Sequence, residues 1–304
     1  MTGPAASETA RAATSGMPPV LGSVLSGLVR SAPRAATTLA SRLAGRAKSA
    51  PDPVLPATEL TRVGVRLESA RVAAYARVCG FGLRDEIPLT YPYVASFPLQ
   101  VALLTSPDFP FPALGTVHLA NTFTWERRVG VSQPLDIAVR AEHLAPHRRG
   151  HQFEVVTIVQ SAGETVWTSR STYLARGTGH PEAAREAAPE VELRPMPIAW
   201  RIAASQGREY AAVSGDYNPI HLSDLSARAF GLPGAIAHGM WSYARVIAHL
   251  GPRLPARGTS TVWFRDPIRL PSTVRLGRSS DGLAIGILPA SGDRTHLVVT
   301  VAED

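Results

Sequence analysis

Two stretches far apart in the chain match each other, and this repeat constrains the fold more than any other feature. Tyr75-Ala-Arg-Val-Cys-Gly-Phe81 aligns with Tyr210-Ala-Ala-Val-Ser-Gly-Asp216, which lies 135 residues later. A weaker echo joins Trp125–Leu135 to Trp263–Thr273 at an offset of 138 residues, where each copy indicates a strand end, a turn and a strand start. Self-similarity at such a spacing indicates a duplicated structural unit. The chain is therefore expected to hold two copies of one fold in tandem.

Each copy is expected to contain a helix followed by antiparallel strands. In the first copy, a strand over Arg62–Leu67 leads into a helix over Ser69–Cys79. Runs rich in Val, Ile, Thr and aromatic residues then predict strands over His118–Trp125, Leu135–Leu144, Phe153–Gln160 and Thr165–Leu174. The second copy repeats the plan with a strand near Trp200–Ile202, a helix to Ser214, helices to about Leu250, and strands over Thr259–Phe264, Thr273–Arg278, Leu283–Leu288 and His296–Val301. This order predicts a sheet wrapped around a helix in each copy.

Changes in composition suggest where the copies begin and end. Residues 1–50 form a basic Ala/Arg/Ser-rich segment, and the first copy is expected over residues 51–176. A polar, Pro-containing linker over residues 177–196 separates it from the second copy over residues 197–304.

The composition excludes several classes of protein. With 45% hydrophobic residues among 304, the chain can bury a sizeable core. Cys79 is its one cysteine, so no internal disulfide forms, and a reducing, cytoplasmic location is expected. His143 and His147 are separated by Pro146 without a third ligand nearby, which indicates solvated side chains. Neither a metal nor a cofactor is expected, and no apolar run is long enough for a transmembrane segment.

The net charge of +7 suggests nucleic acid until it is located along the chain. Residues 1–50 carry six basic residues against one acidic residue, which leaves only +2 for everything that follows. The body lacks the Lys/Arg blocks that follow a phosphate backbone, so no nucleic-acid partner is expected. Residues 1–50 themselves leave three alternatives open: a helix packed on the body, a helix on a membrane surface, or a targeting segment. The first is favoured.

The stretch from Tyr210 to Met240 carries most of the chemical information. Gly215 suits a left-handed helix stop, Asn218-Pro219 forces a turn, and the spacing over Ile220–Phe230 predicts a helix. Asp216 and His221 therefore flank a tight turn, and a carboxylate beside an imidazole can hold one water or hydroxyl and move protons. Gly239 opens a further helix, where its N–H lacks an intrahelical partner and can bind an anionic oxygen.

This stretch resembles the signature of the MaoC-like (R)-specific 2-enoyl-CoA hydratase family, approximately YAxxSGDxNPIHxxxxxA followed by HGM. The matching residues are Gly215, Asp216, Asn218, Pro219, Ile220, His221, Ala227, His238, Gly239 and Met240. The chain length and the segments PLTYP and FPFPALG are similar to those of actinobacterial 3-hydroxyacyl-thioester dehydratases of that family. The resemblance covers about residues 55–304. It implies an α+β double hot dog, with two antiparallel sheets each wrapped around a central helix.

The first copy has lost the acid–base residues. Phe81 stands where the second copy has Asp216, and Glu86 stands where it has His221. The apolar insertion over residues 88–112 is expected either to line a pocket for an acyl chain or to be a loop packed on its own core. Phe81, together with Tyr91 and Phe97 of the insertion and Asn218 of the turn, is expected to contact substrate.

The resemblance implies reversible dehydration of (3R)-3-hydroxyacyl thioesters carried on coenzyme A or acyl carrier protein. Asp216 and His221 then share the proton transfers, Gly239 binds the thioester oxygen, and His238 is structural. A serine often found eight residues after the glycine is replaced here by Ile247. Two alternatives stay open: a hot dog thioesterase that uses a carboxylate and water, and a non-catalytic acyl-thioester binding subunit. Pairing into a homodimer also stays open.

Overall fold

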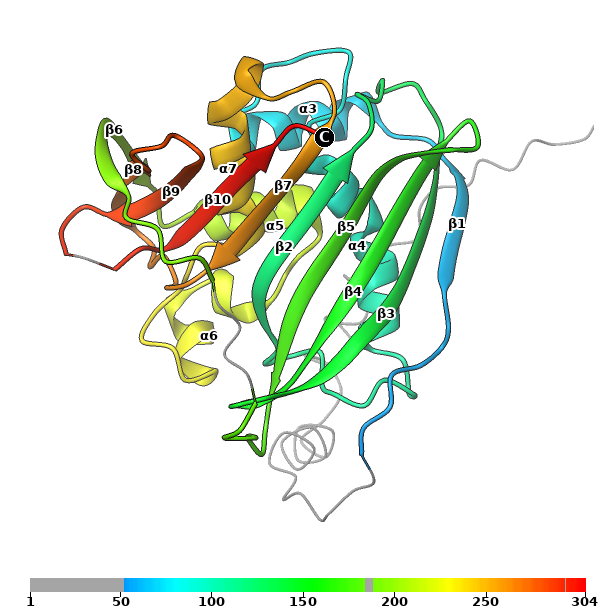
Figure 1. Ribbon diagram of the computed structural model, residues 1–304, viewed down its shortest axis with the longest axis horizontal. Coiled ribbons are helices and arrows are strands. Elements are labelled where there is room, and N and C mark those ends of the chain that lie inside the picture. The colour runs from blue at the N-terminus through cyan, green and yellow to red at the C-terminus, as the bar shows by residue number, and fades with distance from the viewer. Residues whose placement is uncertain (1–51, 184–187, 293) are drawn as a thin grey trace, which may run out of the picture. The chain divides into compact units, whose positions relative to one another are not determined.

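Ten strands form one continuous antiparallel sheet in the computed structural model, which describes residues 52–183, 188–292 and 294–304 (Figure 1). The strand order is β1-β3-β4-β5-β2-β7-β10-β9-β8-β6. The first half contributes β1 (Leu60–Val65), β2 (Val117–Trp125), β3 (Leu135–His147), β4 (Gly150–Ser161) and β5 (Glu164–Arg176). The second contributes β6 (Arg194–Ile202), β7 (Gly258–Phe264), β8 (Ser272–Arg278), β9 (Ala284–Pro289) and β10 (Leu297–Ala302). The predictions for residues 1–50 lie outside the described residues.

Outward from the central β2–β7 pair, the strands of the two halves follow one another in the same order. β2 pairs with β7 at the centre, and β5, β4, β3 and β1 follow on one side as β10, β9, β8 and β6 follow on the other. The two halves thus share one topology, as the sequence repeat predicts. At the junction, the hydroxyl of Thr122 lies 2.9 Å from that of Thr261, and the hydroxyl of Thr124 lies 2.8 Å from that of Thr259.

Each half of the sheet holds one long helix against its concave side. The helices are α3 (Ser69–Cys79), α4 (Tyr91–Leu104), α5 (Gln206–Ser214), α6 (Asp224–Ala229) and α7 (Gly239–Leu250), with short 3-10 helices η1 (Pro219–His221) and η2 (Gly251–Arg253). α4 packs on β3 and β4, and α7 packs on β9 and β10; both lie behind the sheet in Figure 1. α3 packs against α5 and α7. This is the α+β double hot dog that the family resemblance implied, except that the two expected sheets join through β2 and β7 into one.

The buried faces of the sheet and the helices form one core. Along β2, Asn121, Phe123 and Trp125 are buried while the residues between them are partly exposed, as the alternation of side chains in a strand requires. In α7, Tyr243 and Ile247 are fully buried. None of the described helices is long and apolar enough to span a bilayer.

The expectation that residues 88–112 form a loop was wrong, because most of this stretch is α4, whereas the expectation that they line an acyl pocket stays a prediction. The two prolines of α4 hid the helix. Pro92 lies in the first turn, where its missing N–H has no partner to lose, but Pro98 lies inside the helix and removes one backbone hydrogen bond. Packing of α4 on β3 and β4 outweighs this local preference. α4, rather than α3, is the central helix of the first half.

Three further details differ from the sequence predictions. The expected helix over Ile220–Phe230 is divided, because the side chain of Ser223 accepts a hydrogen bond from Ser226 N and starts α6 only after η1 has ended. The alignment of Trp125 with Trp263 was wrong: Trp125 is buried on the helix side, whereas Trp263 falls between the buried residues of β7 and belongs to the other face. β6 begins at Arg194, inside the stretch expected to be linker; prolines are tolerated there because β6 is an edge strand.

Candidate functional site

Asp216 directly follows the end of α5 and is held by its own loop. Gly215 adopts the left-handed conformation, with φ of 80°, which turns the chain out of the helix. The backbone N–H of Asp216 donates to the hydroxyl of Ser214 at 3.2 Å, and its Oδ1 accepts from the backbone N–H of Asn218 at 3.1 Å. Its side chain is 30% exposed. The carboxylate is therefore fixed in direction yet open to a molecule arriving from solvent.

His221 ends the short helix η1 and is buried. Asn218 caps this helix, because its side-chain oxygen accepts a 3.4 Å hydrogen bond from Ile220 N. Nδ1 of His221 donates to the carbonyl oxygen of Ile236 at 2.8 Å, which leaves the lone pair on Nε2. Burial lowers the pKa of His221, although the Asp216 carboxylate opposes this shift. The ring is thus neutral near pH 7, and Nε2 can accept a proton.

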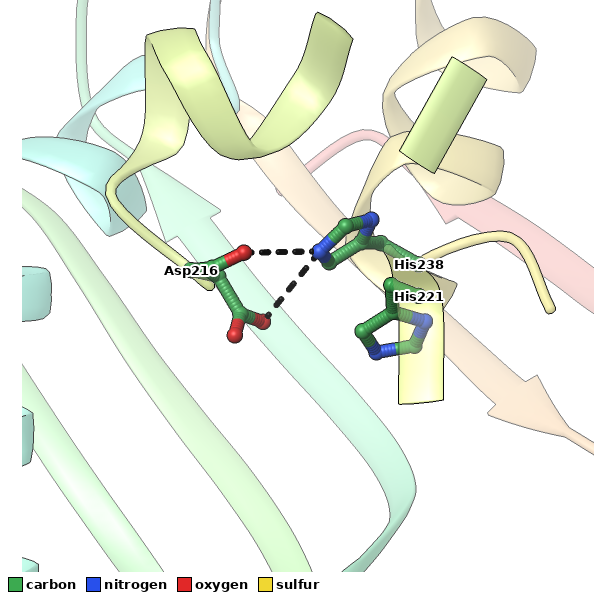
Figure 2. Close-up of side chains that lie close together, drawn as sticks. All are labelled: Asp216, His221 and His238. Carbon is green, nitrogen blue, oxygen red and sulfur yellow. Dashed lines mark hydrogen bonds and ion pairs between the residues drawn. The ribbon is translucent and has the colours of Figure 1, made fainter. Parts of the chain in front are cut away.

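His238 contacts both of the other residues, which its sequence context alone did not reveal (Figure 2). Its Nε2 donates to the backbone carbonyl of Asp216 at 3.0 Å and lies 3.8 Å from the carboxylate Oδ2. Its ring stacks on that of His221 with 3.7 Å between centroids. Burial lowers the pKa of His238 to about 3, so the ring stays neutral. His238 therefore ties the Asp216 loop to the His221 ring without adding charge.

Gly239 begins α7 directly after His238. The backbone N–H of this first helical residue has no intrahelical partner, and no described residue accepts a hydrogen bond from it. The N-terminus of a helix also carries a partial positive charge. A free donor thus lies one residue from His238, at the end of the helix where an anionic oxygen is stabilised.

Gly207 in the first turn of α5 explains how close this helix comes to His221. A side chain here has no room: a Cβ on Gly207 would overlap the carbonyl oxygen of His221 and lie 2.8 Å from the carbonyl carbon. Within the helix alone, Gly207 is unfavourable by about 1 kcal/mol relative to Ala. Its role is tertiary, because the missing side chain lets α5 support the backbone of η1.

The residues expected to contact substrate separate into three groups. Phe97 on α4 lies beside the Asp216 loop, since a Cβ on Gly215 would meet its ring at 3.8 Å. Phe81 and Tyr91 instead pack around Tyr75, with ring centroids 6.3 and 5.2 Å from it. Phe81 occupies the position in the first copy that matches Asp216 in the second. Asn218 uses its side-chain oxygen to cap η1, so its contribution is to the turn.

Asp216, His221 and His238 also present ligand atoms that all lie within 4.8 Å of one another, a set that could hold a metal ion. Spacing along the chain could not predict this set, because the three residues come from separate elements. The hydrogen bonds that these three residues make suit proton transfer better than metal binding. Nε2 of His238 carries a proton that it donates to a carbonyl oxygen, so this atom has no lone pair to offer a cation.

Comparison with known proteins places these residues in a family. Residues 181–284 match the model of the MaoC like domain. A curated relative, 3-hydroxyacyl-thioester dehydratase X of Mycobacterium tuberculosis, is 35% identical over 268 residues, which are 84% of this chain and 95% of the relative. The crystal structure of HtdX from the same organism has a TM-score of 0.71 at 34% identity, covering 80% of this chain and 99% of the other.

A second structure supports the fold alone. The MaoC-like dehydratase of Phytophthora capsici has a TM-score of 0.67 at 18% identity, covering 83% of this chain and 98% of the other. The signature residues from Gly215 to His221 fall inside the matched MaoC region, and the double hot dog extends over the described chain. The chain belongs to the MaoC-like dehydratase family.

Proposed function

We propose that this chain is a hydro-lyase that adds water reversibly to trans-2-enoyl thioesters and forms (3R)-3-hydroxyacyl thioesters. One observation carries the proposal: ligand atoms of Asp216, His221 and His238 lie within 4.8 Å of one another, Nε2 of His221 keeps its lone pair, and the free N–H of Gly239 directly follows His238 in the chain. A relative named a dehydratase of 3-hydroxyacyl thioesters, 35% identical over most of the chain, supports the same reaction class. The carrier is coenzyme A or acyl carrier protein.

In hydration, a water held by Asp216 and His221 attacks C3 of the enoyl group. One water proton passes to this pair, the oxygen bonds to C3, and the pair delivers a proton to C2. Charge that develops on the thioester oxygen is stabilised by the N–H of Gly239. Dehydration runs through the same steps in reverse. Asp216 and His221 act together as one coupled acid–base pair, with His238 as a positioning residue beneath it.

The proposal assigns different tasks to the two copies. Residues 197–304 supply the acid–base pair and the donor, and residues 51–176 supply part of the wall that faces the acyl group. Cys79 is the one cysteine of the sequence and is buried, which agrees with a reducing compartment such as the cytoplasm.

The test is hydration of crotonyl-CoA, followed by loss of the enoyl absorbance, with wild type and Asp216→Asn measured side by side. Turnover in wild type and loss of at least about 100-fold in the variant are expected, because general acid–base catalysis contributes about that much or more. Circular dichroism and thermal unfolding of both proteins show whether the variant is folded. An equally active Asp216→Asn protein would remove the carboxylate from the mechanism, and release of free thiol would indicate a thioesterase instead.

A further inference from the structure

Aromatic side chains close both sides of the site and come from both copies. Phe97 of α4 lies against Gly215, directly before Asp216. Phe264 at the end of β7 lies against Gly239, because a Cβ on this glycine would meet the phenyl ring at 3.0 Å. Asp216 and the Gly239 donor are therefore bordered by one phenyl ring each.

Three side chains of the first copy lie behind the phenyl rings, and we call Tyr93, His118 and Tyr173 the aromatic row. The ring of His118 stacks on Tyr173 with 4.5 Å between centroids and lies 5.0 Å from Phe264. The ring of Tyr93 is 6.3 Å from His118 and 6.3 Å from Phe97. The row thus touches both borders of the site and joins them into one wall.

The two tyrosines of the aromatic row are closed to solvent, whereas His118 and the Asp216 carboxylate are partly exposed. The Asp216 side chain is 30% exposed, but Tyr93 and Tyr173 are only 6% and 8% exposed. The two tyrosine hydroxyls lie 3.1 Å apart and share a hydrogen bond that ties α4 to β5. Behind Tyr173 the wall continues to Phe153, which is fully buried with its ring 5.7 Å from Tyr173.

This contrast in exposure fixes the direction in which a thioester can lie. The carrier is large and polar, so it must extend from the site into solvent. The acyl end is the part that can face a buried aromatic wall. In the proposed mechanism the thioester carbonyl and the next two acyl carbons lie at Gly239 and Asp216. Further methylene groups of the acyl chain must then fit between Phe97, Phe264 and the aromatic row.

On this basis, which rests on the proposed function, we propose that the aromatic row is the closed end of the acyl pocket and limits the chain to short acyl thioesters. The ring volumes of the three residues set this limit. The chemical identity of His118 does not: its Nε2 is buried without a hydrogen-bond partner, and burial lowers its pKa to about 3. A neutral imidazole in this place fills space as a phenyl ring would.

The experiment compares hydration of crotonyl-CoA with that of trans-2-octenoyl-CoA by the full chain. Wild type is expected to favour crotonyl-CoA in kcat/KM. Tyr93→Ala and His118→Ala remove ring volume from the wall, and each is expected to raise the octenoyl-to-crotonyl ratio by about tenfold or more, since one methylene group in a pocket is worth that much. Phe111→Ala removes an aromatic ring that stacks on Phe153 and belongs neither to the aromatic row nor to its two bordering phenyl rings, so it is expected to leave the ratio unchanged.

His118→Phe separates volume from polarity, because it keeps a ring of similar size and removes both nitrogens, the unpartnered Nε2 and the one hydrogen-bonded to the backbone of Ala120. This variant is expected to keep the wild-type ratio. A wild type that favours octenoyl-CoA would overturn the proposal, as would folded Tyr93→Ala and His118→Ala proteins with an unchanged ratio.

Binding of saturated alkyl-CoA thioethers, measured by calorimetry, tests the pocket without turnover. Tighter binding of the butyl than of the octyl thioether by wild type, reversed in Tyr93→Ala, supports the closed end even if no substrate is hydrated. The same length dependence in both proteins contradicts it. If wild type hydrates neither substrate, the proposed function is rejected. The proposed pocket is then decided by the binding measurement alone.

Discussion

Substituting Gly207 by Ala is expected to disable the site through a contact that involves no catalytic group. The new Cβ would overlap the His221 carbonyl oxygen and lie 2.8 Å from the carbonyl carbon, whereas ordinary contacts begin at 3.4–4 Å. The backbone of η1 must then move by about 1 Å, and a misplacement of this size costs about 100-fold in rate. That factor corresponds to about 2.7 kcal/mol of transition-state free energy.

The local preference of the helix acts in the opposite direction. Ala is favoured over Gly in a helix by up to about 1 kcal/mol, so α5 itself gains stability while η1 is displaced. Gly207→Ala is therefore expected to remain folded and to lose activity. Hydration of crotonyl-CoA gives kcat/KM, and thermal unfolding reports on the fold.

Gly177→Ala is the matched control, because a Cβ at Gly177 meets no atom within 4 Å. This variant is expected to keep wild-type kcat/KM. If folded Gly207→Ala also hydrates crotonyl-CoA at the wild-type rate, the close approach of α5 does not position His221, and the argument above is refuted.

Three other predictions concern the donor, the helix ends and the pH dependence of stability. Gly239→Pro removes the proposed N–H donor at a first helical position, where Pro is tolerated, and the preceding His238 already has the extended ψ of 134° that a residue before proline adopts. The kcat of this variant is expected to fall about 100-fold or more below that of Gly239→Ala. Equal kcat values would exclude the N–H from catalysis. Gly80→Ala is expected to lower the melting temperature more than Gly64→Ala, because both have positive φ but only at Gly80 would a Cβ overlap the Arg245 guanidinium. Burial lowers the pKa of His118 to about 3, whereas the unfolded chain binds this proton near pH 6.5, so the free energy of unfolding falls as the pH drops below about 6.5. In urea titrations at pH 7 and pH 5, the loss of unfolding free energy should be smaller for His118→Phe than for wild type. An identical loss in both proteins would contradict the buried neutral imidazole.

The sequence predicted most strands because alternation and turn residues are local signals. β2 and β5 were expected at His118–Trp125 and Thr165–Leu174 and extend only one or two residues further at their ends. α4 and the start of β6 were missed for a shared reason, since proline is unfavourable in isolated helices and strands. Packing on β3 and the position of β6 at an edge decide these cases, and neither can be read from a local window.

The candidate site was only partly predictable. Asp216 and His221 could be paired because they lie only five positions apart across a turn, a distance at which local geometry is decisive. His238 was in the recognised signature, but its stacking on His221 depends on the Ala235–Ala237 segment, which bonds across to Ile268 and Leu270. The close approach of Gly207 and the position of His118 likewise arise between elements. Such contacts leave no periodic pattern in one sequence.

The tandem arrangement has a consequence for saturation behaviour. In two identical chains that associate around a two-fold axis, every substitution occurs twice, so an altered residue changes both sites together. Here the β2–β7 pair joins two halves whose side chains differ, and Phe81 replaces a carboxylate in one half without affecting Asp216 in the other. In the proposed mechanism each chain therefore has one reaction centre, in the second half, and the matching position in the first half is free to change. Titration with a tight-binding substrate analogue should give one equivalent per chain and a hyperbolic curve.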